Sequence, residues 1–219
     1  MTRAPSPYLV SGFYDRALRD GRHRDIVGGR WDETGRLQMA LLQAHGLQPN
    51  QTLLDIGAGS LRLGCKAVPY LDPGHYWATD ASRALMLRGR EMELPDPDRL
   101  PEDRLVEDAD FAFPNLPLRV DCLIAFGLFT HLPPGQTAHA LARIARRWPE
   151  PRVLLFTVFL APEDHAGESL RQPDGVVTHP DRPPWHLTET ALRGMADAAG
   201  LTLERQPDRL PRGQVLFRA

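Results

Sequence analysis

Cysteine and lysine are both scarce in this chain of 219 residues. The two cysteines are Cys65, on a predicted helix, and Cys122, inside a predicted buried strand. Two isolated thiols indicate neither a disulfide framework nor a metal site, so we read both as small apolar residues. Lysine occurs only at Lys66, and arginine supplies the other basic side chains. We attribute this bias to a GC-rich coding sequence and infer no binding partner from it.

Long hydrophobic runs and a strong charge bias are also missing. No apolar stretch is long enough to span a bilayer, and the N-terminus lacks the sustained apolar segment of a secretory signal. We therefore expect one cytoplasmic domain, residues 1–219, with no membrane partner. The formal net charge is −2, the sequence pI is about 6.4 and the basic residues are scattered. These values argue against a nucleic-acid partner.

The stretch from Leu53 to Asp80 carries the clearest pattern in the chain. Residues 52–56 read as a short buried strand that runs into Gly57-Ala58-Gly59 and then into an apolar-periodic helix. Glycines at such a turn let the backbone approach a ligand closely. Residues 76–79 read as the second strand and lead to Asp80, whose carboxylate is placed to accept hydrogen bonds from both hydroxyls of a ribose. The stretch therefore predicts a βαβ unit that binds a nucleoside.

The spacing of the glycines separates two kinds of nucleoside site. A dinucleotide site needs a third glycine in Gly-x-Gly-x-x-Gly, and this chain has Arg62 there. The pattern with Asp55 as the acid and Gly57 and Gly59 as the two glycines instead resembles class I S-adenosylmethionine-dependent methyltransferases of the small-molecule type. Leu61 departs from it, because many members have a further glycine there, but the chain fits the variants that read Gly-Ser-Leu-Arg. The alternative is a tight turn in some other α/β protein.

The resemblance implies an α/β fold in which a Rossmann-like seven-stranded, mostly parallel sheet has helices on both faces and an antiparallel last strand. Residues 51–219 would form this core. The residue pattern places its further strands at 104–107, 120–126, 153–159, 201–205 and 214–218, and helices at 81–89, 135–148 and 188–199. Residues 160–185 show no periodicity, and we expect them to form an irregular lid over the substrate.

Residues 1–50 show no strand pattern and predict an N-terminal helical cap. Helices are expected at 11–19 and 34–45. In methyltransferases of the type that this chain resembles, N-terminal segments fold over the cofactor, which makes Tyr14 and Trp31 candidate lid residues in contact with the substrate. The alternative for Trp31 is that it packs the cap onto the sheet.

Residues beyond the third and fourth strands complete the cofactor site that the resemblance implies. We choose Asp110 and Phe111 over Asp108 as the contacts to the adenine, and the alternative is that these acids are solvated loop residues. Phe126 and Gly127 follow the fourth strand, where the methionine part of the cofactor would lie. The expected cofactor-binding residues are Asp55, Gly57, Ala58, Gly59, Arg62, Asp80, Ala81, Asp110, Phe111, Phe126 and Gly127.

Methyl transfer is an in-line displacement at the methyl carbon, and a neutral acceptor must also lose a proton. Histidine is the natural base near neutral pH, and His131 and His186 are the two candidates for the catalytic residue. The alternative is that each is a hydrogen-bonded structural residue. Phe129, His131 and Trp185 join Tyr14 and Trp31 as expected substrate contacts.

Two subclasses of methyltransferase are excluded by the residues beyond the fourth strand. Metal-dependent members have a carboxylate there to bind magnesium, and this chain has Gly127-Leu128-Phe129, so we expect no metal. Enzymes that methylate nucleic-acid amino groups have an Asn/Asp-Pro-Pro-Tyr element at the same place, and it is absent.

The function expected from the sequence is methyl transfer from S-adenosylmethionine to an oxygen or nitrogen of a small molecule, in a natural-product tailoring step, with S-adenosylhomocysteine as product. The protein would be a monomer or a homodimer. The alternative is a non-catalytic Rossmann-like module that binds S-adenosylmethionine or a nicotinamide cofactor. Retention of Asp55, both glycines and Asp80 favours the enzyme.

Overall fold

The computed structural model describes residues 12–149 and 153–219. These residues divide into two units, which we describe separately. The N-terminal unit contains residues 12–124 and 153, and the C-terminal unit contains residues 125–149 and 154–219. Among the described residues, no helix is both long enough and apolar enough to cross a membrane.

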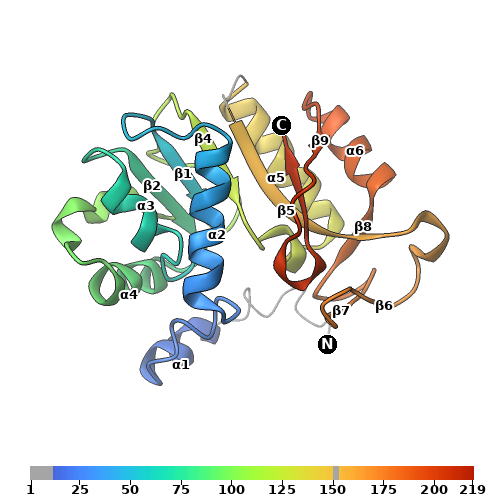
Figure 1. The fold of residues 1–219 in the computed structure, drawn as a ribbon, viewed down its shortest axis with the longest axis horizontal. Coiled ribbons are helices and arrows are strands. Elements are labelled where there is room, and N and C mark those ends of the chain that lie inside the picture. The colour runs from blue at the N-terminus through green and yellow to red at the C-terminus, as the bar shows by residue number, and fades with distance from the viewer. Residues whose placement is uncertain (1–11, 150–152) are drawn as a thin grey trace. The chain divides into compact units, whose positions relative to one another are not determined.

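Four parallel strands form the sheet of the N-terminal unit (Figure 1). They lie in the order β3-β2-β1-β4, with the bounds β1 Leu53–Ile56, β2 Tyr76–Asp80, β3 Leu105–Glu107 and β4 Cys122–Ala125. Leu54 of β1 lies opposite Trp77 of β2 and Leu123 of β4. Strand β1 is buried at every position, and three of its four residues are apolar, which is why it was predictable; the exception is the motif acid Asp55. The carboxyl ends of β1 and β2 meet at one edge of the sheet.

Helices α3 (Gly64–Tyr70) and α4 (Arg83–Glu93) both contact β2. Ser82 caps α4, because its hydroxyl accepts the Leu85 N–H over 3.2 Å. The predicted end of this helix at Gly89 is wrong, since α4 continues to Glu93. A side chain at Gly89 would meet the backbone of Ser60, so this glycine allows a close approach between two segments and does not end the helix.

The predicted helical cap corresponds to α1 (Phe13–Arg19) and α2 (Trp31–Ala44), and residues 12–50 contain no strand. Ser11, the expected start of the first helix, lies outside the described residues. Helix α2 begins at Trp31, earlier than the expected Thr34, and contacts α3. Short 3-10 turns at Pro97–Arg99 and Glu102–Arg104 lead from α4 to β3.

Strand β5 (Val153–Ala161) belongs to the C-terminal unit from Leu154 onward (Figure 1). Its apolar and β-branched residues are almost all buried. Strand β10 (Val215–Arg218) runs antiparallel to β5 and to β9 (Glu204–Arg205), which confirms the predicted closing pair of strands. The rings of Phe156 on β5 and Phe217 on β10 stack with their centroids 5.9 Å apart. Burial of these rings joins the two strands in one core.

Two helices contact each other within the C-terminal unit. Helix α5 (Pro134–Arg147) begins with a proline, which is tolerated in the first turn because its nitrogen needs no partner there. Helix α6 (Glu189–Ala198) is capped by Thr188, whose hydroxyl accepts the Ala191 N–H over 3.1 Å. The helix expected over 188–199 is therefore confirmed, with Thr188 as its cap.

Residues 160–185 contain regular structure, and the expectation of an irregular segment is wrong. Strands β6 (Leu170–Arg171) and β7 (Val177–Thr178) form a short antiparallel hairpin, and His179 and Trp185 form an isolated bridge. Strand β8 (His186–Thr188) then adds to the end of β5 as a parallel neighbour. These strands are too short to show a period in the sequence, which is why the pattern did not reveal them.

Candidate functional site

The glycine turn after β1 folds back onto the end of β2. Gly57 and Gly59 have φ angles of 75° and 57°, a region that glycine enters without strain. The N–H groups of Gly57 and Ala58 donate to the carbonyl of Thr79 over 2.8 and 3.0 Å. The two predicted glycines are therefore needed for the backbone path, and the turn lies directly beside the strand that carries Asp80.

Asp80 is bound to this turn through its side chain. Its Oδ2 accepts the N–H of Gly59 over 2.8 Å, and its Oδ1 accepts the N–H of Ser82 over 3.0 Å. The side chain is buried, and burial raises the pKa of Asp80 from 3.8 to about 6, against the lowering effect of hydrogen bonds from Gly59, Ser82 and Ala81. The carboxylate has further lone pairs that can accept donors from a ligand.

Asp55, the first acid of the motif, has a different environment. Its Oδ2 accepts the hydroxyl of Tyr76 over 2.8 Å, and both residues are buried. Burial raises the pKa of Asp55 to about 7, while the Tyr76 hydrogen bond and the positive charge of Arg62 act in the opposite direction. The structure thus gives Asp55 a partner within the sheet.

A loop of the helical cap, residues 23–29, covers the glycine turn, and we call it the cap loop. The Ser60 hydroxyl donates to the carbonyl of His23 over 2.7 Å, and Arg62 Nη1 donates to the carbonyls of Val27 and Gly29 over 2.8 and 3.3 Å. A side chain on Gly59 would have its Cβ 2.5 Å from Val27 Cγ1. Arg62, an expected cofactor residue, therefore contacts protein backbone, and the contribution of Val27 was not foreseen.

Trp31 packs among the charged residues that fasten the cap loop to α4. The guanidinium of Arg24 lies over its ring, 5.3 Å from the centroid, and the ring of His23 meets it edge-on at 6.4 Å. Glu93 of α4 accepts from Arg24 Nε and Nη2 over 2.7 Å each and lies 2.6 Å from His23 Nε2. These contacts favour the packing alternative for Trp31 over a role in binding substrate.

In the turn after β3, Asp108 and Asp110 have different roles. Asp108 Oδ1 accepts the N–H groups of Asp110 and Ala112, and its Oδ2 accepts the N–H of Phe113 over 2.8 Å. Asp108 therefore shapes the loop, and the choice of Asp110 and Phe111 as the adenine contacts stays a prediction. The Asp108 N–H donates to the Asp80 carbonyl over 2.8 Å, so this loop and the glycine turn flank the same strand end.

The loop after β4, residues 127–131, is held by buried threonines in the C-terminal unit. The Gly127 N–H donates to Thr157 Oγ1, and the Thr130 hydroxyl donates to the Gly127 carbonyl, both over 2.7 Å. Trp185 is buried, and its N–H donates to the Thr130 carbonyl over 2.8 Å. The structure thus brings Trp185 to the loop that carries Gly127, Phe129 and His131 and that follows Phe126.

The two candidate bases differ in their surroundings. Burial and the nearby positive charge of Arg212 lower the pKa of His131 from 6.5 to about 4, so its imidazole is neutral at pH 7. His186 is 3% exposed, its Nδ1 lies 2.9 Å from Thr178 Oγ1 and its Nε2 lies 3.4 Å from the Ala166 carbonyl. Two protein partners suit a structural histidine that ties the β6–β7 hairpin to β8, which is the structural alternative for His186.

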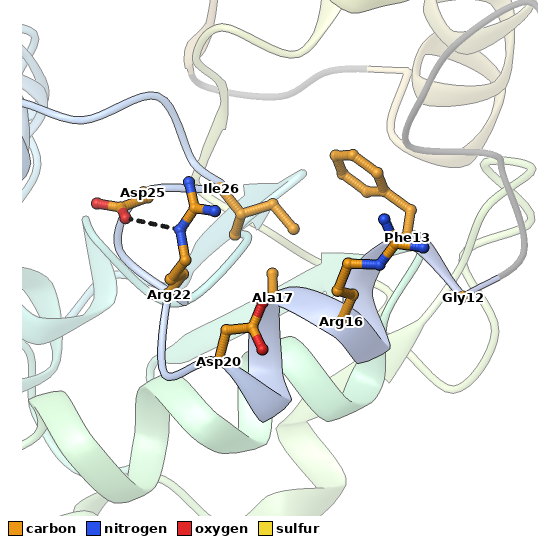
Figure 2. Close-up of a pocket in the computed structure, with 8 residues that line it drawn as sticks. All are labelled: Gly12, Phe13, Arg16, Ala17, Asp20, Arg22, Asp25 and Ile26. Atoms are coloured by element: carbon orange, nitrogen blue, oxygen red, sulfur yellow. Dashed lines mark hydrogen bonds and ion pairs between the residues drawn. The ribbon is translucent and has the colours of Figure 1, made fainter.

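A pocket of about 360 Å³ opens between α1 and the start of the cap loop (Figure 2). Figure 2 shows Phe13 and Arg16 reaching into it from α1, with Ile26 on the opposite wall. Arg22 is paired with Asp25 over 3.2 Å at its rim. The volume suits a small molecule, and the walls offer both apolar surface and charge. Tyr14 lies on the same helix but is not among the residues that line the pocket.

The sequence matches no protein-family model. Among solved structures, magnesium protoporphyrin IX methyltransferase from Synechocystis PCC 6803 is 13% identical with a TM-score of 0.60, over 97% of this chain and 95% of that one. The 1,6-didemethyltoxoflavin-N1-methyltransferase of Burkholderia thailandensis is 22% identical with a TM-score of 0.57, over 94% and 84%. Human N-acetylserotonin methyltransferase is 16% identical with a TM-score of 0.63, over 94% of this chain but 57% of its own. The chain thus has the Rossmann-like fold of these S-adenosylmethionine-dependent methyltransferases, as predicted.

Proposed function

We propose that this protein transfers the methyl group of S-adenosylmethionine to an oxygen or nitrogen of a small molecule and releases S-adenosylhomocysteine. The observation that carries the proposal is the pairing of the buried Asp80 carboxylate with the Gly59 N–H at the end of β2. That pairing lies in a fold shared with magnesium protoporphyrin IX and 1,6-didemethyltoxoflavin methyltransferases, whose structures contain S-adenosylhomocysteine. This pairing supports the proposal that Asp80 is the ribose ligand.

The residues of the glycine turn fit a nucleoside cofactor. A buried carboxylate whose pKa is raised to about 6 has fewer donors than its charge needs, and two ribose hydroxyls would supply them. Asp110 and Phe111 follow β3, next to the Asp80 strand end, and would contact the adenine. When bound, the cofactor supplies a methyl group on a positively charged sulfur that a nucleophile can displace.

The contribution of the protein to methyl transfer is to align the acceptor and to take its proton. Of the two candidate bases, we propose that His131 takes the proton, because it lies in the same loop as Gly127 and Phe129 and its imidazole is neutral at pH 7. A pKa of about 4 makes His131 a weak base, so its main effect would be to accept a hydrogen bond that orients the acceptor nucleophile. Phe129 and Trp185, from the same part of the C-terminal unit, would pack against the acceptor.

The solved structures support the acceptor class. One methyltransferase with this fold is bound to 1,6-didemethyltoxoflavin. We therefore propose a small organic acceptor modified in a natural-product tailoring step, in a cytoplasmic protein that is a monomer or a homodimer. The segment 160–185 remains our proposed lid, now with the β6–β7 hairpin as its ordered part.

Ligand-induced stabilisation tests the cofactor and separates the enzyme from its alternative. S-adenosylhomocysteine should raise the melting temperature of the purified chain in a concentration-dependent way, and NAD should not, because only a ligand of the native state stabilises it. Labelled S-adenosylmethionine should then pass its methyl group to a small phenol or amine in an acceptor panel. Stabilisation by NAD alone would contradict the proposal and favour a nicotinamide-binding module.

A further inference from the structure

A continuous chain of hydrogen bonds links Gln214, the residue before β10, to the loop after β4. All of its members lie within the C-terminal unit. Thr157 Oγ1 on β5 donates to Gln214 Oε1 over 2.6 Å and accepts the Gly127 N–H over 2.7 Å. The Thr130 hydroxyl donates to the Gly127 carbonyl, and the Thr130 carbonyl accepts the Trp185 N–H. Both polar groups of the Gly127 backbone are therefore held by threonine hydroxyls.

The Thr157 hydroxyl has no freedom to make other bonds. The side chain is 0% exposed, and a hydroxyl has one proton to donate. Since its oxygen accepts the Gly127 N–H, the proton goes to Gln214, and loss of either partner would leave a buried polar group unsatisfied. Gly127 itself has a φ of 72°, so the backbone turns sharply at the point where the hydrogen bond holds it.

Gln214 is in turn fixed from its other side. It follows the 3-10 turn Pro211–Gly213, where the Arg212 N–H donates to Asp174 Oδ2 over 2.7 Å. A side chain at Gly213 would have its Cβ 2.6 Å from Pro173 Cδ, so this turn packs closely against residues 172–174. The same turn carries Arg212, whose charge acts on His131. Residues 211–214 therefore act on the loop after β4 at two points: Gln214 through Thr157, and Arg212 through its charge on His131.

We propose that Thr157 and Gln214 are positioning residues for methyl transfer, which set the backbone of the loop 127–131 so that Gly127 meets the cofactor and His131 meets the acceptor. This inference rests on the proposed function. Thr157 and Gln214 do not themselves contact the reacting atoms. They act through the Gly127 backbone, and the sequence offered no motif that pointed to either of them.

The test compares hydroxyl-deleting and hydroxyl-keeping variants in the full-length chain. Thr157→Val and Gln214→Leu remove the hydrogen bonds, Thr157→Ser keeps them, and Thr137→Val is the matched control, because Thr137 is a buried threonine of α5 whose hydroxyl has no hydrogen-bond partner among the described residues. Affinity for S-adenosylhomocysteine is measured by calorimetry at a temperature where circular dichroism shows each variant folded. Hydrogen exchange of peptides covering 126–131 is measured on the same samples.

We expect Thr157→Val and Gln214→Leu to bind S-adenosylhomocysteine about tenfold more weakly than the parent and to exchange faster at 126–131, since Thr157→Val loses both hydrogen bonds of the buried hydroxyl and Gln214→Leu loses the one to Gln214. Thr157→Ser and Thr137→Val should match the parent in both measurements. Faster exchange with parental affinity, or no change in either, would overturn the positioning role. If Thr157→Val does not fold, Gln214→Leu decides by the same criteria. If the parent fails to bind S-adenosylhomocysteine, the proposed cofactor is refuted instead. In that case hydrogen exchange still tests the contact, because a parental exchange rate at 126–131 in Gln214→Leu would show that Gln214 does not hold the loop.

Discussion

Tyr76 donates its hydroxyl to Asp55 over 2.8 Å, so the first acid of the glycine motif is joined to the first residue of β2 inside the sheet. Burial makes the ionised form of Asp55 unfavourable and raises its pKa to about 7. In the unfolded chain the same group ionises near its ordinary value of 3.8. The folded protein therefore holds this proton more tightly than the unfolded chain does. Asp55 thus affects the stability of the fold, in addition to any effect on ligand binding.

The pH dependence of stability tests this account of Asp55. Its contribution is fully present below about pH 4 and is lost as the pH rises through about 7, a change on the order of 4 kcal/mol. Asp55→Asn keeps an oxygen for Tyr76 and cannot ionise. The free energy of unfolding of Asp55→Asn relative to the parent should therefore rise between pH 5 and pH 8 in urea titrations. Asp72→Asn, at an exposed position, is the control, and a flat difference for Asp55→Asn would contradict the buried titration.

Asp80 gives a prediction on ligand affinity. Its pKa of about 6 means that the free protein loses the carboxylate charge below that pH, and a neutral carboxyl is a weaker acceptor for ribose hydroxyls. Affinity for S-adenosylhomocysteine should fall about tenfold between pH 8 and pH 5. Asp80→Asn keeps an acceptor for the Gly59 N–H but has no charge. This variant should bind more than tenfold more weakly at pH 8 and show little dependence on pH.

Calorimetric titration at both pH values decides the role of Asp80. Parental affinity in Asp80→Asn would mean that Asp80 only holds the glycine turn. A parental pH dependence in the variant would assign the titration to another group.

The central strands and the glycine turn were predictable because their physical causes are local. A strand buried on both faces is mostly apolar, as β1 and β5 are, and a backbone with positive φ favours glycine, as at 57 and 59. The placement of Asp80 beside Gly59 followed from these two facts. Cap residues such as Thr188 were predictable for the same reason, because the hydroxyl bonds to the next turn of its own helix.

Features that depend on contacts far apart in the chain were not predictable. Gly89 read as a helix end, yet it faces Ser60, and nothing in the sequence around it reveals that approach. Residues 160–185 read as irregular because bonds that order them, such as the Arg212 N–H to Asp174 Oδ2 over 2.7 Å, join residues far apart in the sequence. Arg62 was expected at the cofactor, and its bond to the Val27 carbonyl depends on where the cap loop folds.

The contact between Val27 and Gly59 predicts that the cap loop limits what the glycine turn tolerates. Gly59→Ala should destabilise the fold, because its Cβ meets Val27 Cγ1 and because a φ of 57° strains any residue with a side chain. Val27→Ala removes the clash but leaves the strain. The double variant should therefore lose less stability than the two single variants added together, by about 1 kcal/mol. Urea unfolding of the four proteins measures this coupling, and additive effects would show that the two residues do not touch in solution.

The last prediction concerns the charge state of His131. Its pKa of about 4 in the folded protein lies below the ordinary 6.5, so the unfolded chain takes up this proton first and the stability that His131 contributes is lost as the pH falls from about 6.5 to 4. In NMR titrations the Cε1–H signal of His131, assigned by its absence in His131→Asn, should not shift between pH 8 and pH 5.5. Arg212→Gln removes the second cause of the lowered pKa and should move the midpoint upward. Methyl transfer by the parent should likewise show no loss near pH 6.5 that depends on His131. A midpoint near 6.5 in the parent would show that His131 is solvated. No change of the midpoint in Arg212→Gln would show that the turn Pro211–Gly213 does not reach His131 in solution.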